Sequence, residues 1–527
     1  TLIRSRRQRQ MCIRDRVCSD STSRASRSSF SPPRPRWRRP LVLCDPATVL
    51  DYDVIIIGSG FGGSVSALRL SEKGYRVALL EAGRRFSSND FPKSNWNLRK
   101  FLWFPRLGMR GIQRLTLLRD VLVLSGAGVG GGSLVYANTL YEPHDAFFTD
   151  PQWRDIADWK AELAPHYEQA KRVLGAVEHP HTTPSDLVLQ HIAEHFGAGD
   201  TYRPTPVGVY FGEKGRTDPD PFFGGAGPDR TGCTACGGCM VGCRFDAKNS
   251  LDRNYLFLAE QAGAQVHADT QAVAVYPRRN GGYAIETQRP GAWLRKRPRS
   301  FTAGQVIFSA GALGTTRLLL EMRHTGLLPD LSPRLGHNTR TNSEAILGAT
   351  SRHTGTDYSE GVAITSSIHP EPHTHIEPVR YPRGSNVMGL LATILVDGDG
   401  RVPRQIRFLG QVVRHPIAFL RTLSLRRWAE RSVILLVMQS LDNKIRLSLK
   451  KGLFGVSLKS TQDSAQPNPT FIPVANEAAR VAAEAIGGFP SSALNEVLLD
   501  TPTTAHIIGG ACIGAHPGEG VIDAYHR

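Results

Sequence analysis

Residues 51–83, DYDVIIIGSGFGGSVSALRLSEKGYRVALLEAG, decide the fold of this chain. The apolar, β-branched run at 53–57 predicts a strand that is buried on both faces. A G-x-G-x-x-G turn follows it, then a helix from about residue 62 to 73 and a second strand. Together these elements predict the opening strand–helix–strand unit of a doubly wound α/β domain that binds a dinucleotide.

Each glycine of this turn has a physical task. Gly58 allows the tight turn, Gly60 lets the backbone approach a pyrophosphate, and Gly63 lets the helix pack closely on the strand. The phosphates would rest on the amino end of the helix, where Phe61 and Gly62 also lie. An ordinary glycine turn is the simpler alternative, but the order of strand, turn, helix and second strand favours a binding site.

Glu81 supplies the next expected contact of a dinucleotide. It closes the second strand, 23 residues beyond Gly58, where its carboxylate can accept both hydroxyls of an adenosine ribose. A 2′-phosphate would be repelled there. This unit alone does not separate FAD from NAD.

A second glycine-rich segment, VLVLSGAGVGGGSLVYANTLYEP, spans residues 121–143. Strand-like runs at 121–124 and 134–137 flank its glycines. The flanks favour an ordered turn over a flexible loop.

Four ordered motifs carry a family resemblance. They are LLEAG at the end of the first unit, GVGGGSLVYAN at 128–138, VIFSAGALGTTRLLL at 306–320 and AHIIGGACIG at 505–514. In this order they resemble the landmarks of the glucose-methanol-choline (GMC) flavin oxidoreductases, and most closely the bacterial cholesterol-oxidase branch. The resemblance runs from about residue 51 to the end of the chain.

The resemblance implies FAD as the cofactor. It places the segment 128–133 along the flavin and its pyrophosphate, which only backbone without side chains can approach so closely. It also places Val273 near the adenine, although any core strand explains a valine. The further cofactor-binding residues that it implies are Gly128, Gly130, Gly131, Gly132, Ser133 and Asn138.

The same resemblance names two catalytic candidates. His506, in TAHIIGG, matches the active-site histidine that manages the hydroxyl proton. Glu377, in THIEPVRYPRG, is the counterpart of a glutamate that moves a proton from C4 to C6, and its apolar neighbours should raise its pKa. A surface glutamate paired with Arg380 is the simpler interpretation of Glu377, and Glu344 is the competing candidate.

The implied reaction is oxidation of a lipophilic alcohol, with a 3β-hydroxysterol such as cholesterol as the leading substrate. A hydride would pass to flavin N5, and the Δ5 ketone would isomerise to the Δ4 ketone. Oxygen or a redox partner would accept the electrons. The alternatives are an alcohol dehydrogenase that uses an iron–sulfur centre and a cytochrome or quinone, and an inactive flavin fold that binds lipid or a partner.

Four cysteines lie close together in TGCTACGGCMVGCRFDAKNS, residues 231–250. Cys233, Cys236, Cys239 and Cys243 reproduce the C-x2-C-x2-C-x3-C run of bacterial ferredoxins, with Arg244 in place of the usual proline. An iron–sulfur cluster is one interpretation, zinc a weaker one, and structural or redox-inactive thiols the third.

The predicted fold class is α/β. A discontinuous Rossmann-like FAD-binding domain of GMC type is joined to an α+β substrate-binding domain with an antiparallel sheet. The expected parts are a basic leader at 1–50, the FAD-binding domain at 51–143, substrate-side segments at 144–230, the Cys-rich segment with the second FAD-binding part at 231–334, the substrate-binding domain at 335–480, and the start of a carboxy-terminal flavin and active-site segment at 481–527. Family members continue beyond the histidine motif, so a truncated carboxy terminus is expected.

The formal net charge of +17 invites a nucleic-acid partner, but residues 1–50 carry about half of it as Arg. That segment lacks the apolar core of a secretory signal. We interpret it as non-native or artefactual sequence, with a transit peptide or basic tail as alternatives. The eight cysteines form no secreted disulfide framework, which predicts a cytoplasmic protein that binds no nucleic acid.

The stretch 401–431 holds eight Arg and a single Glu among apolar residues. Such basic amphipathic segments can lie in a lipid headgroup layer, which predicts peripheral membrane contact. A helical pair packed on its own domain, with solvated arginines, is the alternative.

Overall fold

The structure is a computed structural model that describes residues 49–292, 297–452, 455–463 and 466–527. The predicted leader lies outside the described residues up to position 48. From residue 49 onward the chain forms one compact unit, so the predicted boundaries within it stay predictions. Among the described helices, none is both long and apolar enough to cross a membrane.

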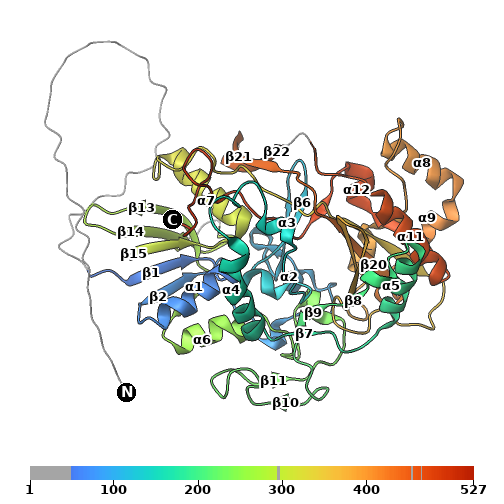
Figure 1. Ribbon diagram of the computed structural model, residues 1–527, viewed down its shortest axis with the longest axis horizontal. Coiled ribbons are helices and arrows are strands. Elements are labelled where there is room, and N and C mark those ends of the chain that lie inside the picture. Colours follow the sequence, from blue (N-terminus) through green and yellow to red (C-terminus); the bar gives the residue numbers. More distant parts are fainter. Residues whose placement is uncertain (1–48, 293–296, 453–454, 464–465) are drawn as a thin grey trace, which may run out of the picture. The chain divides into compact units, whose positions relative to one another are not determined.

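A six-stranded sheet contains the strands of the opening unit, at the left of Figure 1. Its order is β12-β2-β1-β15-β14-β13. The first four strands run parallel to one another, β14 pairs antiparallel with β15, and β13 pairs antiparallel with β14. The strands are β1 (Tyr52–Ile57), β2 (Val77–Leu80), β12 (Gln265–His267), β13 (Gln271–Pro277), β14 (Tyr283–Gln288) and β15 (Arg299–Phe308). The predicted α/β class is confirmed.

Helices cover both faces of this sheet. α1 (Phe61–Ser71) and α6 (Tyr255–Gln261) pack on the face that carries Ile56, and α7 (Gly311–Thr325) packs on the face that carries Ile57. Both isoleucines are buried, and burying one such side chain contributes about 1.5–3 kcal/mol. This two-sided burial explains the unbroken apolar run of β1.

The second large sheet has seven antiparallel strands in the order β19-β23-β16-β20-β18-β17-β8. Its strands are β8 (Arg203–Pro204), β16 (Ala345–Ser351), β17 (Ser366–Glu371), β18 (Thr374–Val379), β19 (Ala392–Ile394), β20 (Ser432–Gln439) and β23 (Gly488–Ala493). α5 (Pro184–His195) and α11 (Pro473–Ala485) pack on the face that carries Ile368 and Ile376. The opposite face carries apolar side chains such as Ile346 and Ile434 together with the polar Glu377.

A small sheet joins the carboxy-terminal segment to the second glycine segment. β24 (Thr503–Thr504) runs parallel to β6 (Leu122–Gly126), which pairs with β5 (Gln113–Leu117). β-bridges from Glu344 to Thr503 and from Arg340 to Ile508 pair the chain before β16 with β24 and with the chain that follows β24. Residues far apart in the sequence thus meet at one place.

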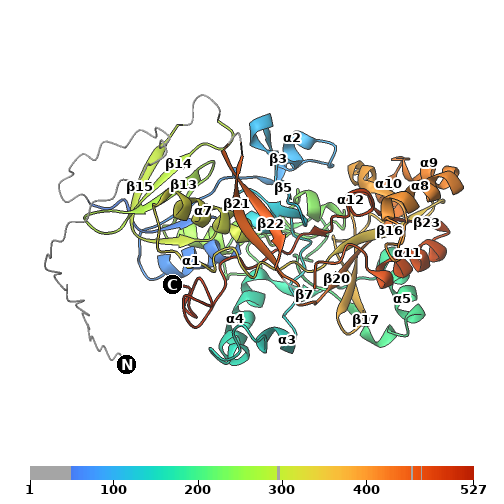
Figure 2. The same ribbon diagram turned by 90° about the horizontal axis from the view of Figure 1, so that it is seen from above.

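The other elements connect or cover these sheets. β21 (Ile445–Gly452) and β22 (Gly455–Gln462) form a hairpin that contacts α7 (Figure 2). The remaining helices are α2 (Leu98–Phe101), α3 (Asp145–Phe148), α4 (Trp159–Leu174), α8 (Arg404–Arg414), α9 (Pro416–Thr422), α10 (Trp428–Arg431) and α12 (Leu494–Leu499). The remaining short strands are β3 (Trp103–Phe104), β4 (Met109–Arg110), β7 (Ala176–Glu178), β9 (Pro206–Gly208), β10 (Thr217–Asp218) and β11 (Arg230–Thr231).

One local prediction is wrong. The run 134–137 is not a strand, because the chain forms the 3-10 turn η3 (Gly131–Leu134) and continues in a turn. Gly130 and Gly131 have positive φ angles of 106° and 55°, which coil the backbone just where an extended chain was expected. The predicted strand at 121–124 is present as β6.

Candidate active site

The first glycine turn leaves the amino end of α1 open. Its N-cap, Gly60, provides no side-chain cap, and a Cβ placed there would meet no atom within 4 Å. By contrast, a Cβ on Gly58 would lie 2.3 Å from the carbonyl oxygen of Ser309, and one on Gly63 would lie 2.0 Å from the carbonyl oxygen of Gly58. Two of the glycines therefore serve packing, while Gly60 faces room for a phosphate.

Glu81 holds the turn together from the end of β2. Its Oε2 accepts hydrogen bonds from the N–H and the hydroxyl of Ser59, at 3.1 and 2.7 Å, and its Oε1 accepts one from the N–H of Gly83 at 2.8 Å. A carboxylate offers about four acceptor positions, so at least one remains for a ribose hydroxyl. Sequence reasoning missed Ser59, because it occupies a variable position of the glycine pattern.

The two glycine segments touch each other. A Cβ on Gly131 would lie 2.7 Å from the Cα of Gly60, and the N–H of Gly130 donates to the Ser59 hydroxyl at 3.2 Å. A Cβ on Gly132 would meet nothing within 4 Å, so this glycine faces open space. The sequence predicted that both segments bind one cofactor, and the structure brings them together.

Three other predicted cofactor residues differ in what they contact. The Ser133 hydroxyl donates to the Gly130 carbonyl and accepts from the N–H of Leu251, so it is engaged within the protein. Asn138 is buried with a φ of 76°, and neither polar atom of its side chain has a hydrogen-bond partner among the described residues. Val273 lies at a β-bulge in β13.

These features fit a dinucleotide cofactor with a flat ring. The uncapped helix end offers N–H groups to phosphates, and the open positions over Gly60 and Gly132 admit close approach. The buried Asn138 amide lacks a partner, which a polar cofactor group can supply. Phe61 and Gly62 lie in the first turn of the same helix.

His506 lies where the carboxy-terminal segment meets the chain before β16. Its Nδ1 is 2.8 Å from Nδ2 of Asn342 and 3.4 Å from Oε2 of Glu344. Both of these contacts, within the described residues, use Nδ1, so Nε2 is available to a substrate. Gly509 and Gly510 follow at φ angles of 84° and 79°, and this turn lets the chain pass close to the carbonyl of Asn338.

Glu344 orients His506 and favours its protonated form. Its side chain is 1% exposed, and Oε2 also accepts hydrogen bonds from the N–H of Ala505 at 3.0 Å and from the Asn342 amide at 3.2 Å. Burial by itself lowers the pKa of His506, but the Glu344 hydrogen bond and charge, together with the charge of Glu377, raise the pKa above its usual value. Glu344 is therefore a partner of His506.

Glu377 lies on the polar face of β18 and is fully buried. Burial raises its pKa to about 7; Tyr141 and His506 act against this effect, and Glu344 adds to it. The predicted ion pair with Arg380 is wrong, because that guanidinium donates to the Glu360 carbonyl and the Thr365 hydroxyl. Glu344 and Glu377 are thus members of one site rather than rivals.

Sequence reasoning missed a row of three histidines, which begins with His375 beside Glu377. The ring of His375 stacks on His369, with centroids 4.6 Å apart, and His144 meets His369 edge-on at 5.6 Å. Strand alternation was the available signal. In β17 and β18, Ile368 and Ile376 enter the core, so their neighbours His369, His375 and Glu377 share the opposite face.

The four cysteines are free thiols. Burial raises the pKa of Cys233 to about 12 and that of Cys239 to about 11. Among the described residues, no group of three or more Cys, His, Asp or Glu side chains is placed to hold a metal ion. The iron–sulfur and zinc interpretations therefore gain no support from the geometry.

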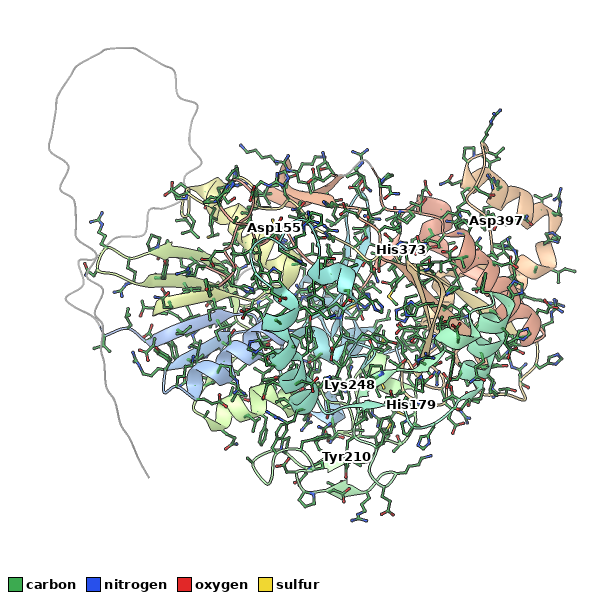
Figure 3. The ribbon with its side chains drawn as sticks, in the orientation of Figure 1. Asp155, His179, Tyr210, Lys248, His373 and Asp397 are labelled. Atoms are coloured by element: carbon green, nitrogen blue, oxygen red, sulfur yellow. The ribbon has the colours of Figure 1, made fainter. Side chains whose placement is uncertain are left out.

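The cysteine segment does support the second glycine segment. Lys248, labelled in Figure 3, is buried, and its ammonium donates to the carbonyls of Leu134, Tyr136 and Cys239 at 3.1, 2.8 and 3.0 Å. Burial lowers the pKa of Lys248 to about 8, so its carbonyl partners are needed to hold the charged form.

Comparison with known proteins gives consistent results. The GMC oxidoreductase family model matches residues 226–342, and an FAD-binding domain model matches residues 53–92. A cholesterol oxidase of Mycobacterium tuberculosis is 54% identical over 489 residues, which cover 90% of this chain and 84% of the relative. A cholesterol oxidase of Acinetobacter baumannii is 43% identical, covering 90% of this chain and 87% of the relative.

A solved structure supports the fold. Pyridoxine 4-oxidase from Mesorbium loti superimposes with a TM-score of 0.55 at 16% identity, covering 90% of this chain and 91% of that chain. At this identity the likeness concerns the fold alone.

Proposed function

Because this chain belongs to the GMC oxidoreductase family, in its cholesterol-oxidase-like branch, we propose that it oxidises the 3β-hydroxyl of a sterol, with oxygen as the electron acceptor. The chain is an FAD-dependent oxidoreductase that acts on CH–OH groups. The observation that carries the sterol proposal is the convergence of His506, Glu344 and Glu377 in one site, since a basic histidine and a buried carboxyl suit oxidation followed by isomerisation.

FAD, when bound, accepts the hydride that leaves the alcohol carbon. In the tautomer whose Nδ1–H donates to Glu344, His506 takes the hydroxyl proton at Nε2. Only the neutral imidazole can accept that proton, so oxidation requires His506 to be deprotonated before substrate reacts.

This requirement predicts how pH controls oxidation. Glu344 raises the pKa of His506, so kcat/KM should rise as pH increases through that raised pKa. Glu344→Gln removes the charge but keeps an acceptor oxygen, and the acidic limb of the profile should move to lower pH. Steady-state kinetics from pH 5 upward measure the shift; an unmoved acidic limb in the variant would rule out Glu344 as the source of the raised pKa.

Glu377 would carry out the isomerisation. A carboxyl whose pKa is about 7 is partly ionised at neutral pH, so it can take a proton from C4 and return it to C6. Because Glu377 is buried, little water reaches the transferred proton.

FAD would be held by the residues of the two glycine segments, by Glu81, by Asn138 and by the chain near Val273. The alternative, electron exit through an iron–sulfur centre at the four cysteines, has a direct test. The purified protein should show flavin absorption bands alone. An additional broad visible band, together with iron and acid-labile sulfide, would instead support the dehydrogenase with a cytochrome or quinone partner.

The stretch 401–431 supports a second proposal, binding to an anionic membrane surface. The inner side of α8 and α9, at the right of Figure 1, packs on the domain through Phe408, which is buried against Ile394 and Val497. An outer face remains exposed and apolar. Its members are Ile406, Leu409, Val413, Ile417, Leu420 and Leu423, each more than half exposed.

The spacing of Ile406, Leu409 and Val413 places them along one side of α8, away from Phe408. Arg414 and Arg421 are exposed at the ends of the two helices and suit anionic headgroups. One side of the segment therefore packs on the domain, as expected for a helical pair packed on its own domain. Its other side is exposed to solvent. A cytoplasmic enzyme that docks peripherally in this way would meet a lipophilic substrate at the bilayer.

The double substitution Leu409→Glu and Val413→Glu should weaken vesicle binding at least about a hundredfold, because two inserted side chains contribute about 1.5–3 kcal/mol each. Co-sedimentation with phosphatidylserine-containing vesicles measures the effect. Leu107→Glu is the matched control, since Leu107 is 71% exposed in η2 (Pro105–Leu107), outside these helices. Equal binding by the double variant and the unaltered protein would refute the membrane proposal.

A further inference from the structure

Glu377 has a neighbour on its own strand to which the proposed reaction assigns no task. His375 and Glu377 are two residues apart in β18, so they share one face of the sheet. Nε2 of His375 lies 3.7 Å from Oε1 of Glu377. Both atoms are buried, and neither has a hydrogen-bond partner among the described residues.

Two unpartnered polar atoms that face each other in a buried site require an explanation. The distance of 3.7 Å is longer than a hydrogen bond, but a small rotation of the carboxyl closes it. Other groups that face Glu377 are the Tyr141 hydroxyl, His506 and Glu344, which come from three other segments. Of these neighbours, His375 alone pairs an unsatisfied buried nitrogen with the unsatisfied oxygen.

The surroundings of His375 keep it uncharged. Burial lowers the pKa of His375 to about 3, and the neighbouring His369, His144 and His506 act in the same direction. His369 stacks on the ring at 4.6 Å, and Tyr141 meets it edge-on at 5.2 Å. An imidazolium here would stabilise the carboxylate and lower the pKa of Glu377, whereas a neutral ring can bond the carboxyl without that large effect.

We propose that His375 is a positioning residue for Glu377: its neutral Nε2–H donates to Oε1 and aims Oε2 at the two carbons between which the proton moves. The inference rests on the proposed isomerisation. In that step the C4–H bond breaks, the proton binds Oε2, the double bond shifts from C5–C6 to C4–C5, and the proton passes to C6. No oxidant or reductant takes part.

The test supplies the Δ5-3-ketosteroid directly to the FAD-loaded enzyme, so that isomerisation is measured without oxidation. His375→Phe keeps a ring against His369 but has no donor. We expect its isomerisation kcat to fall about tenfold or more and the pH midpoint of isomerisation to move upward, because the carboxylate loses a donor. His375→Gln, which returns an N–H, should restore most of the rate.

His373→Phe is the matched control, because His373, labelled in Figure 3, is exposed in the turn that joins β17 and β18. Flavin absorbance should stay unchanged in all three variants, and cholesterol oxidation should stay unchanged in the His373→Phe control. An H375F enzyme with the unaltered rate and midpoint would overturn this inference alone. If the unaltered enzyme oxidises cholesterol but does not isomerise the supplied ketone, both this inference and the proposed isomerisation fall, while the proposed oxidation stands.

Discussion

Replacing Glu377 by Gln should reduce isomerisation by about a thousandfold while cholesterol oxidation stays within a few-fold of the unaltered rate. The amide fills the same volume but cannot take up and return a proton. The oxidised sterol should then leave the enzyme as the Δ5 ketone, which lacks the ultraviolet absorption of the conjugated Δ4 ketone. Product analysis by chromatography with ultraviolet detection measures the ratio of the two.

The pH dependence of the same step follows from the raised pKa. The carboxylate form is the base, so isomerisation of supplied Δ5 ketone should decline as pH falls below about 7. Glu496→Gln is the matched control, because Glu496 is another buried carboxyl whose pKa burial raises, to about 8, and its Oε1 accepts from the N–H of Ile346. Full isomerisation by E377Q would show that another group carries the proton.

Replacing His506 by Gln should lower kcat/KM for oxidation by about a hundredfold to ten-thousandfold, the usual range for loss of a general base. Glu344 would keep a donor near its Oε2, so the local structure should survive. Flavin content and isomerisation of supplied ketone should be retained, because neither requires the His506 proton step. Stopped-flow measurement of flavin reduction isolates the affected step.

His516→Gln is the control for this substitution, since His516 lies in the same carboxy-terminal segment with an exposed ring 3.3 Å from Glu519. Its kinetics should match those of the unaltered enzyme. If H506Q reduced its flavin at the unaltered rate, His506 could not be the proton acceptor.

The cofactor half of the site was predictable because its signals are local. The strand, glycine turn, helix and second strand follow one another, and nearby backbone leaves no room for a side chain at Gly58 or Gly63. What escaped prediction there was Ser59, which links Glu81 to Gly130 through its hydroxyl. Ser133 was expected to face the cofactor, but its hydroxyl instead joins η3 to the chain at Leu251.

The catalytic half depended on pairings that no local pattern reveals. The motif around His506 identified the histidine, but the bridges that set Glu344 beside it join segments about 160 residues apart. The sequence therefore offered Glu344 and Glu377 as competitors. His375 and His369 could have been found, because the apolar Ile368 and Ile376 mark the opposite face of their strands.

The central claim is that this chain uses FAD to oxidise a sterol hydroxyl, and anaerobic reduction of the bound flavin tests it most directly. The purified, FAD-loaded protein is mixed without oxygen with cholesterol or with a long-chain primary alcohol, and flavin absorbance is followed. The account predicts rapid bleaching by cholesterol and little by the primary alcohol. Bleaching by the primary alcohol with no response to cholesterol would contradict it.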